Sequence, residues 1–139
     1  IIALLHGKMV VLILLTAALG SLIAALKYNW YPAKILVGDV GTLSIGAIIA
    51  VAVILGNLEI AGLCLLIPFI IDFFIKAKHH FPYTFGEYKN GKLYCPSDGP
   101  KGLAHVILKL TGGLKESNLT LLLMGIEAMF GVIAILFYL

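Results

Sequence analysis

The chain has 139 residues, of which 61% are hydrophobic and only 12% are charged, and its mean hydropathy is +1.07. A soluble domain usually carries about 25% charged residues, so this composition excludes an ordinary soluble protein. The chain has ten lysines, no arginine and seven acidic residues, which gives a formal net charge of +3. No basic stripe on a folded surface is evident, so we expect a membrane protein without a nucleic-acid partner.

Four apolar runs follow one another along the chain, and each is long enough to cross a bilayer core of about 30 Å. The first two runs contain no charge, the third contains only Asp72, and the fourth contains only Glu127. The transmembrane helices are expected at about 8–27, 41–57, 60–76 and 118–138. We expect an all-α polytopic membrane protein that forms a single membrane domain over 1–139.

The segment 29–42 joins the first two runs and places Asp39 between Gly38 and Gly41. An acid at the lip of a membrane helix is costly unless a cation meets it. Glycines on either side let the backbone turn sharply and let a large anionic ligand approach closely. The pattern indicates a carboxylate that binds a metal or a substrate. The alternative is that Asp39 only caps a helix that begins near Gly41.

The lysines predict an orientation in the membrane. Nine of the ten fall in two connections, 27–39 and 76–117, which lie on the same side of a membrane if there are four spans. By the positive-inside rule, both connections face the cytoplasm and both termini face outward.

The longer connection, 77–117, is expected to carry a small β-hairpin. Two short segments, 83–88 and 92–95, flank Asn90-Gly91. Asn-Gly is the strongest short signal for a two-residue hairpin turn.

The same connection is expected to carry an amphipathic helix that lies on the membrane surface. Leu103, Ile107 and Leu110 recur at helical spacing after a Pro- and Gly-containing breaker. Gly112 and Gly113 are expected to stop this helix.

Three potential cations, Lys78, His79 and His80, follow the third run directly. Imidazole is a good metal ligand, so the cluster could hold a metal. It could instead bind phosphate through charge-assisted hydrogen bonds. The third interpretation is a positive-inside anchor without chemistry.

The two acids inside the apolar runs have structural explanations of their own. Asp72 precedes Lys76 by four residues, so a helix-surface ion pair accounts for it. The alternative is that Asp72 orients the cationic cluster. Glu127 lies in mid-span, where an interhelical hydrogen bond or a protonated side chain explains an acid.

Several short motifs together resemble one enzyme family. They are, in chain order, Asn-Trp-Tyr-Pro at 29–32, Val-Gly-Asp at 37–39, a Pro-x-x-x-acid pattern at 68–72, His-His-Phe at 79–81, Lys-Asn-Gly-Lys-Leu at 89–93 and the segment 116–123. This set resembles the polyprenyl-phosphate N-acetylhexosamine-1-phosphate transferases. The motifs at 89–93 and 116–123 look like the branch that acts on dolichyl phosphate. The resemblance runs from about Lys27 to the C-terminus.

The resemblance implies that the chain is the C-terminal part of a longer enzyme. Members have roughly ten spans of bilayer length, and their paired-aspartate and Asn-rich motifs lie upstream of the region that this chain matches. No Asp-Asp pair occurs here. We therefore expect the four helices alone to be inactive and to require the missing N-terminal helices as partners.

The resemblance also implies an activity. It is the transfer of N-acetylglucosamine-1-phosphate from UDP-N-acetylglucosamine to a polyprenyl phosphate of the dolichyl type, with release of UMP. The implied cofactor is Mg²⁺, with Asp39 as a ligand, and a homodimer is a further option. The implied site residues are Asp39 and His80 as catalytic residues, and Leu36, Val37, Gly38, Asp72, Lys78 and His79 as substrate-binding residues. In some members arginines occupy the positions of Lys78 and His80, so point charges or imidazole replace planar donor forks.

The membrane implied by the resemblance is the archaeal cell membrane or the endoplasmic reticulum, with the active site facing the cytoplasm. Two other interpretations belong to different classes of protein. The chain could be part of a transporter or channel, with Asp72 and Glu127 lining an ion path. It could also be a non-catalytic membrane subunit that only binds a partner.

The lysine distribution generates a testable topology. Cysteines introduced at Lys34 and Lys92 should be labelled only from the cytoplasmic side, and one at Asn57 only from outside. Labelling of Asn57 and Lys92 from the same side would overturn the four-span arrangement.

Overall fold

The structure is a computed structural model that describes residues 1–81 and 86–138. It comprises two compact units, one formed by Ile1–Leu63 with Ala134–Leu139 and the other by Cys64–Ile133. Each unit is described by itself below.

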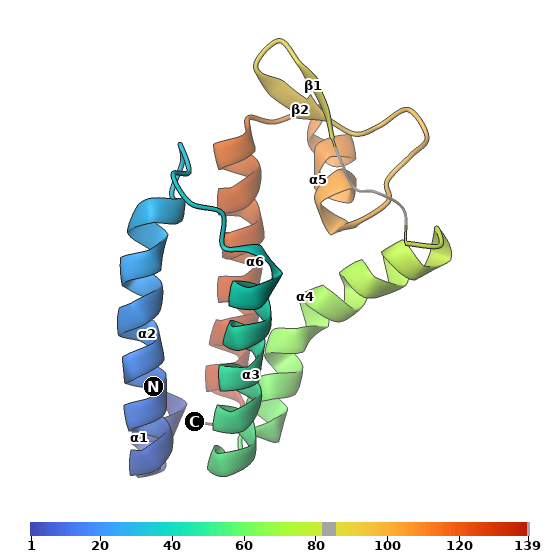
Figure 1. Cartoon of the computed structure of the whole chain (residues 1–139). Coiled ribbons are helices and arrows are strands. Elements are labelled where there is room, and N and C mark those ends of the chain that lie inside the picture. The colour runs from blue at the N-terminus through green and yellow to red at the C-terminus, as the bar shows by residue number, and fades with distance from the viewer. Residues whose placement is uncertain (82–85, 139) are drawn as a thin grey trace. The chain divides into compact units, whose positions relative to one another are not determined.

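The secondary structure is almost entirely helical (Figure 1). The elements are α1 (Ile2–Leu5), α2 (Met9–Asn29), α3 (Gly38–Gly56), α4 (Glu59–Lys78), β1 (Glu87–Lys89), β2 (Lys92–Tyr94), α5 (Leu103–Thr111) and α6 (Glu116–Leu136). Within the described residues, α2, α3, α4 and α6 are the four helices long and apolar enough to cross a membrane. The predicted fold class is confirmed, and the protein is an integral membrane protein. A single membrane domain over the whole chain stays a prediction.

Three of the long helices extend past one of their predicted ends. Helix α3 begins at Gly38 rather than at residue 41, α4 continues to Lys78, and α6 begins at Glu116. Acids lie in the first turns of these three helices, and lysines lie in the last turns of α2 and α4. Both placements complement the helix dipole, so a charge at the membrane boundary prolongs each helix instead of ending it.

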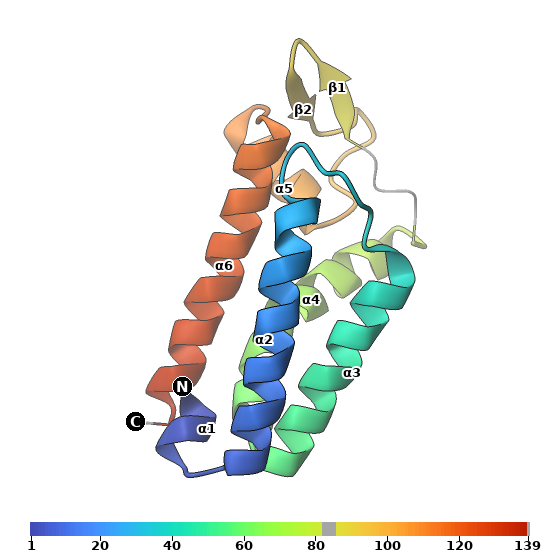
Figure 2. The same cartoon turned by 60° about the vertical axis from the view of Figure 1, so that its left-hand side comes forward.

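In the first unit, α2 and α3 lie side by side (Figure 2). The turn after α3 is tight because a Cβ atom on Gly56 would come within 2.8 Å of the Leu58 side chain and 3.5 Å of Val11. Val11 is only 1% exposed, and Asn57 turns the chain with a φ of 49°. A small residue at Gly56 therefore lets α3 pass directly into the start of α4.

In the second unit, α4 bends along its length (Figure 1). Pro68 lies inside this helix and is buried. Proline has no N–H to donate to the carbonyl four residues earlier, and its ring clashes with that carbonyl. The proline therefore gives a physical reason for the bend.

The predicted hairpin is present. Strands β1 and β2 pair antiparallel with Glu87 opposite Tyr94 and Lys89 opposite Lys92. Between them Asn90 and Gly91 have φ values of 50° and 76°. Positive φ at both positions is what the turn of a two-residue hairpin requires, and it explains the Asn-Gly pair. Residues 83–85 of the expected first strand lie outside the described residues.

The hairpin is attached to the start of α6. Leu93 and Leu114 exchange two backbone hydrogen bonds, with N···O distances of 2.7 and 3.0 Å. The next residue toward α5, Gly113, has a φ of 103° and approaches Tyr94 so closely that a Cβ atom would lie 2.5 Å from the ring. The segment before α6 is thus joined to the two-stranded hairpin by an isolated β-bridge.

Helix α5 is confirmed, and Gly112 ends it with a φ of 69°. Its buried face differs from the predicted stripe of residues 103, 107 and 110. His105 and Leu108 are only 2% exposed, whereas Leu110 is 82% exposed. Helix α5 packs against β2, and of the predicted stripe only Leu110 is exposed, because Leu103 and Ile107 are partly buried.

The two glycines after α5 provide a matched test of this packing. Gly113→Ala should destabilise the full-length protein by about 2 kcal/mol, because the added methyl group meets the Tyr94 ring and the φ angle is unfavourable. Gly112→Ala should cost about 1 kcal/mol, since nothing lies within 4 Å of its Cβ position. Thermal unfolding in detergent checks the order. Equal melting temperatures for the two variants would contradict the role of Tyr94.

Candidate active site

The predicted site residues form two groups at helix ends. Residues 36–39 lie on the connection between α2 and α3 and at the start of α3, in the first unit. Asp72 and residues 78–80 lie in and after the last turns of α4, in the second unit.

The connection before α3 folds back on the end of α2. The N–H of Trp30 donates to the Leu26 carbonyl at 2.8 Å, and the N–H groups of Lys34 and Ile35 donate to the Tyr28 carbonyl at 2.8 and 3.3 Å. The Tyr31–Pro32 peptide bond within it is cis. The three hydrogen bonds hold the chain immediately before the candidate site against the end of α2.

Gly38 and Asp39 open α3. Gly38 has a φ of 63°, which glycine adopts at little cost, so the chain can turn from the connection into the helix. Asp39 is the second helical residue and is exposed, whereas the capping position belongs to Val37 and has no side-chain cap bond. The interpretation of Asp39 as the helix cap is therefore wrong, because α3 starts one residue before Asp39.

The carboxylate of Asp39 forms no hydrogen bond or ion pair with any residue that the structure describes. Thr42 bonds only the backbone carbonyls of Gly38 and Asp39, at 3.2 and 3.1 Å. An exposed carboxylate in a first turn is favoured by the helix dipole and keeps its oxygens available. These oxygens suit a hard cation such as Mg²⁺, which binds proteins through one or two carboxylates and fills its other positions with water and phosphate.

The two glycines beside Asp39 have different roles. A Cβ atom on Gly41 would lie 2.3 Å from Cγ1 of Val37, so Gly41 makes room for that side chain within the helix. Nothing lies within 4 Å of the Cβ position of Gly38. Only Gly38 therefore fits the expected approach of a ligand to the backbone. Leu36, two residues earlier, is 89% exposed.

The cationic cluster begins on α4 and continues on the turn after it. Lys78 is the last helical residue, and the N–H groups of His79 and His80 donate to the carbonyls of Lys76 and Ala77 at 3.1 Å. Lys78, His79 and His80 are all exposed. The structure thus places the three side chains on one short exposed turn.

The turn contains two successive residues with positive φ, His80 at 57° and Phe81 at 52°. Such values are uncommon for side chains other than glycine and cost about 1–3 kcal/mol each where the surroundings impose them. The Phe81 ring lies 5.5 Å from the Phe73 ring, and the Phe81 N–H donates to the Lys76 carbonyl at 2.9 Å. These contacts on α4 hold the turn in its strained conformation.

Asp72 is engaged through both oxygens. Oδ2 forms the predicted ion pair with Lys76 at 2.5 Å, and Oδ1 accepts a 2.7 Å hydrogen bond from the backbone N–H of Leu103. The second contact joins α4 to α5 across 31 residues of sequence. Sequence reasoning missed it because no local spacing relates the two positions.

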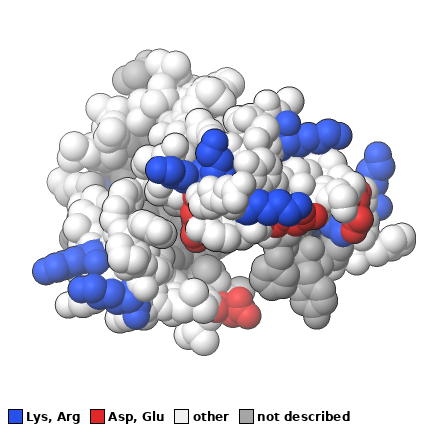
Figure 3. All heavy atoms as spheres, turned by 90° about the horizontal axis from the view of Figure 1, so that it is seen from above, with Lys and Arg blue, Asp and Glu red and all other residues white. Residues whose placement is uncertain are grey.

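Lysines in the second unit differ in whether they form an ion pair. Lys76, Lys89 and Lys101 are paired with Asp72, Glu87 and Asp98 respectively. Figure 3 shows blue lysine and red carboxylate side chains next to one another on one face. Lys78 forms no ion pair with the residues described. Its ammonium group is therefore available for an anion.

Lys89 and Glu87 form an ion pair on the hairpin, outside the spans, and each shifts the pKa of the other. The hydrogen bond from Lys89 lowers the pKa of Glu87, with a further contribution from the Ser97 N–H at 3.4 Å. The hydrogen bond to Glu87 raises the pKa of Lys89. Both groups are exposed, so water screens the pair, and it shapes the hairpin surface more than its stability.

A metal site built from several side chains does not occur within 1–81 and 86–138. No group of three or more His, Cys, Asp and Glu residues there could hold an ion.

His105, to which the sequence assigned no role, is buried and accepts a 3.2 Å hydrogen bond from the Lys101 N–H.

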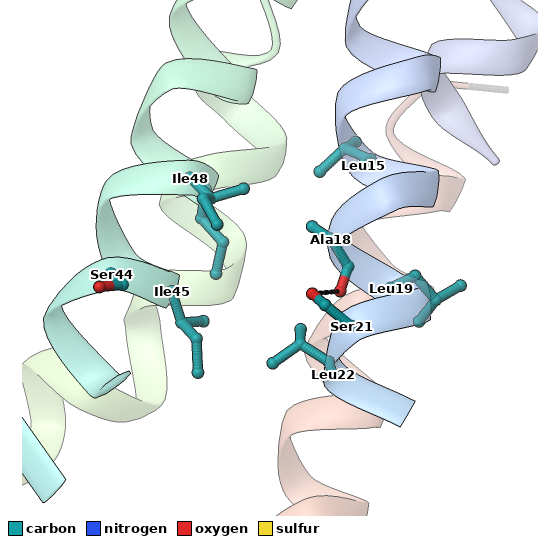
Figure 4. Close-up of a pocket in the computed structure, with 9 residues that line it drawn as sticks. Leu15, Ala18, Leu19, Ser21, Leu22, Ser44, Ile45 and Ile48 are labelled. Atoms are coloured by element: carbon teal, nitrogen blue, oxygen red, sulfur yellow. Dashed lines mark hydrogen bonds between the residues drawn. The ribbon is translucent and has the colours of Figure 1, made fainter. Parts of the chain in front are cut away.

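A groove of about 450 Å³ lies between α2 and α3 (Figure 4). The hydroxyl groups of Ser21 and Ser44 donate to carbonyls of their own helices, at 2.8 and 2.7 Å. The remaining lining is apolar, including Leu15, Leu22 and Ile48. The groove contains none of the predicted site residues and offers a surface for hydrocarbon rather than for chemistry.

Comparison with known proteins supports the predicted family. Residues 1–57 match the model of glycosyl transferase family 4. The chain is 39% identical over 122 residues to a Saccharolobus solfataricus protein provisionally named UDP-N-acetylglucosamine–dolichyl-phosphate N-acetylglucosaminephosphotransferase. It is 35% identical over 134 residues to a protein of the same provisional name from Sulfolobus acidocaldarius. A phospho-N-acetylmuramoyl-pentapeptide-transferase of Streptococcus thermophilus is 31% identical over 94 residues.

These matches cover much of the chain but only part of each relative. They extend over 86%, 95% and 66% of this chain, and over 37%, 39% and 28% of the three relatives. The expectation of a fragment of a longer protein is confirmed by these proportions. The resemblance that rested on short motifs is confirmed as well: residues 1–57 match glycosyl transferase family 4, and the chain is similar along most of its length to part of two dolichyl-phosphate N-acetylglucosaminephosphotransferases.

Proposed function

We propose that the full protein transfers N-acetylglucosamine-1-phosphate from UDP-N-acetylglucosamine to a polyprenyl phosphate and releases UMP. The observation that carries the proposal is the exposed carboxylate of Asp39 in the first turn of α3, which has no hydrogen-bond or ion-pair partner among the described residues. Similarity to the dolichyl-phosphate phosphotransferases supports the substrates. The upstream helices of the same protein would complete the site.

The reaction exchanges one phosphoanhydride for another. An oxygen of the lipid phosphate forms a bond to the β-phosphorus of the nucleotide sugar. The bond from that phosphorus to the oxygen bridging the two phosphates breaks, and this oxygen leaves with UMP. Negative charge is spread over phosphoryl oxygens throughout, so the protein contributes mainly positioning and cations.

Asp39 would hold Mg²⁺ against the diphosphate of the nucleotide sugar. When bound, the ion neutralises charge on the phosphoryl oxygens. Gly38 leaves the backbone open beside the carboxylate, and Leu36 and Val37 border the nucleotide. The hydrogen bonds that hold the preceding connection to α2 keep these residues in place before substrate arrives.

Lys78, His79 and His80 would donate charge-assisted hydrogen bonds to the diphosphate. Lys78 is available because no described carboxylate pairs with it, and the strained turn presents both imidazoles to solvent. Backbone strain of this kind is common where a side chain must be held for function. We further propose that this surface faces the cytoplasm, as the lysine distribution indicates.

The interpretation as a transporter or channel needs Asp72 and Glu127 to line one aqueous path. Asp72 instead uses both oxygens for Lys76 and for the backbone of Leu103. A carboxylate committed to two protein groups is poorly suited to pass ions. The similarity to transferases also favours the enzyme.

Asp39→Asn in the full-length enzyme should retain the fold and lose at least about 2.7 kcal/mol of transition-state stabilisation, roughly a hundredfold in turnover. The amide keeps the shape of the side chain but binds Mg²⁺ poorly. Glu59→Gln is the matched control, because it removes the same charge from the first turn of α4. Transfer of radiolabelled sugar phosphate to lipid measures the effect. Near-normal turnover of Asp39→Asn at ordinary magnesium would exclude the metal-binding role.

Substitutions of His80 distinguish a phosphate site from a transition-metal site. His80→Ala should weaken UDP-sugar binding or slow transfer without changing metal content. His80→Arg should retain function, because guanidinium binds phosphate but cannot ligate a metal. His80→Asn tolerates positive φ without supplying a cation, so it separates charge from backbone conformation. An inactive His80→Arg together with stoichiometric zinc in the parent protein would show that the assignment is wrong.

A further inference from the structure

Helix α5 begins without a cap of its own. Its N-cap is Gly102, which has no side chain and an extended backbone, with φ −177° and ψ 171°. No acid lies in its first turn. The first N–H groups of an α-helix have no partner within the helix, so this end needs an acceptor from elsewhere.

Asp72 supplies that acceptor from another helix. Its Oδ1 lies 2.7 Å from the backbone nitrogen of Leu103, the first residue of α5. The acceptor is a carboxylate at the positive end of a helix dipole, which strengthens the bond. Its other oxygen is held by Lys76, one turn along α4. The two contacts use different oxygens of the same carboxylate.

The contact fastens a larger structure than α5 alone. Gly86, just before β1, lies beside both α5 and β2, since a Cβ atom on Gly86 would be 3.7 Å from the Leu108 side chain and 3.4 Å from the Leu93 side chain. Leu93 is in turn bonded to Leu114 before α6. Asp72 therefore joins α4 to a group of elements that consists of the hairpin, α5 and the start of α6.

The chain between Asp72 and Leu103 includes the cationic cluster. Lys78, His79 and His80 follow Asp72 within eight residues, on a turn whose strained φ angles must be imposed by its surroundings. On the side of α4, Phe81 packs on Phe73, the residue next to Asp72. The cap bond of Asp72 and the ring contact of Phe73 therefore involve adjacent residues of α4, at the end of the helix that carries the cluster.

We propose that Asp72 is a positioning residue that caps α5 from α4 and thereby holds the turn of Lys78, His79 and His80 in its working conformation. It does not contact substrate, because both of its oxygens are engaged by protein groups. The kinetic part of this inference rests on the proposed transferase function, whereas the capping part does not.

Hydrogen–deuterium exchange of the full-length protein in detergent tests the capping. In Asp72→Ala, the amides of α5 should exchange about tenfold faster, because the helix loses its only side-chain acceptor in the described structure. Asp72→Asn keeps an oxygen for Leu103 and should show a smaller increase. Lys76→Ala leaves the cap bond in place and should stay within about twofold of the parent.

Asp98→Asn is the matched control. It removes a carboxylate from an exposed ion pair with Lys101, close to α5 in sequence, without touching the cap. It should leave both exchange and transfer unchanged. Unchanged α5 exchange in Asp72→Ala would overturn the proposal, as would equal acceleration in Asp98→Asn.

Steady-state transfer then separates positioning from direct binding. The loss of kcat/KM should follow the order of exchange, with Asp72→Ala most impaired, Asp72→Asn largely rescued and Lys76→Ala least affected. A residue that binds substrate through its charge would instead make Asp72→Asn as impaired as Asp72→Ala, with α5 exchange unaltered, and that result would overturn the positioning role. A parent protein without transfer activity would refute the proposed function, while the exchange series would still decide the cap.

Discussion

The hydrocarbon core of a membrane offers no partner for a backbone N–H or carbonyl, and this constraint organises the whole chain. Within the described residues, the four long apolar segments satisfy their backbone groups as helices. Irregular backbone, strained φ angles and almost every charge therefore gather at helix ends and in the connections. The candidate site residues follow the same rule: Asp39 lies in the first turn of α3, and Lys78 ends α4.

Helix ends also provide the electrostatics that this chemistry needs. The positive end of a helix dipole favours a carboxylate, and Asp39 lies exposed in the first turn of α3. The negative end favours cations, and α4 ends with Lys76 and Lys78. One of these lysines is committed to Asp72 and the other is not. The same local preference thus yields one ion pair, Asp72 with Lys76, and one lysine, Lys78, that has no ion-pair partner among the described residues.

Glycine serves several purposes in this chain that its composition does not distinguish. Gly38 turns the backbone into α3, Gly41 makes room for Val37, and Gly113 accommodates the ring of Tyr94. Gly102 gives α5 no side-chain acceptor at its N-terminus, and Asp72 provides one by accepting a hydrogen bond from Leu103. Each role depends on which neighbour approaches, and the neighbour comes from the tertiary packing.

The amino-acid sequence by itself determined the four membrane helices, the hairpin turn at Asn90-Gly91 and the ion pair of Asp72 with Lys76. All three depend on spacing within a few residues or on the length of an apolar run, which chain geometry translates directly into structure. The sequence also singled out Asp39 as a candidate site residue, because an acid between glycines at a membrane boundary is unusual in any fold. Only the tertiary structure decided that α5 buries Leu108 instead of Leu110, and that Asp72 reaches Leu103. Those contacts join segments far apart in sequence, and which of them form depends on how α5 packs against its neighbours.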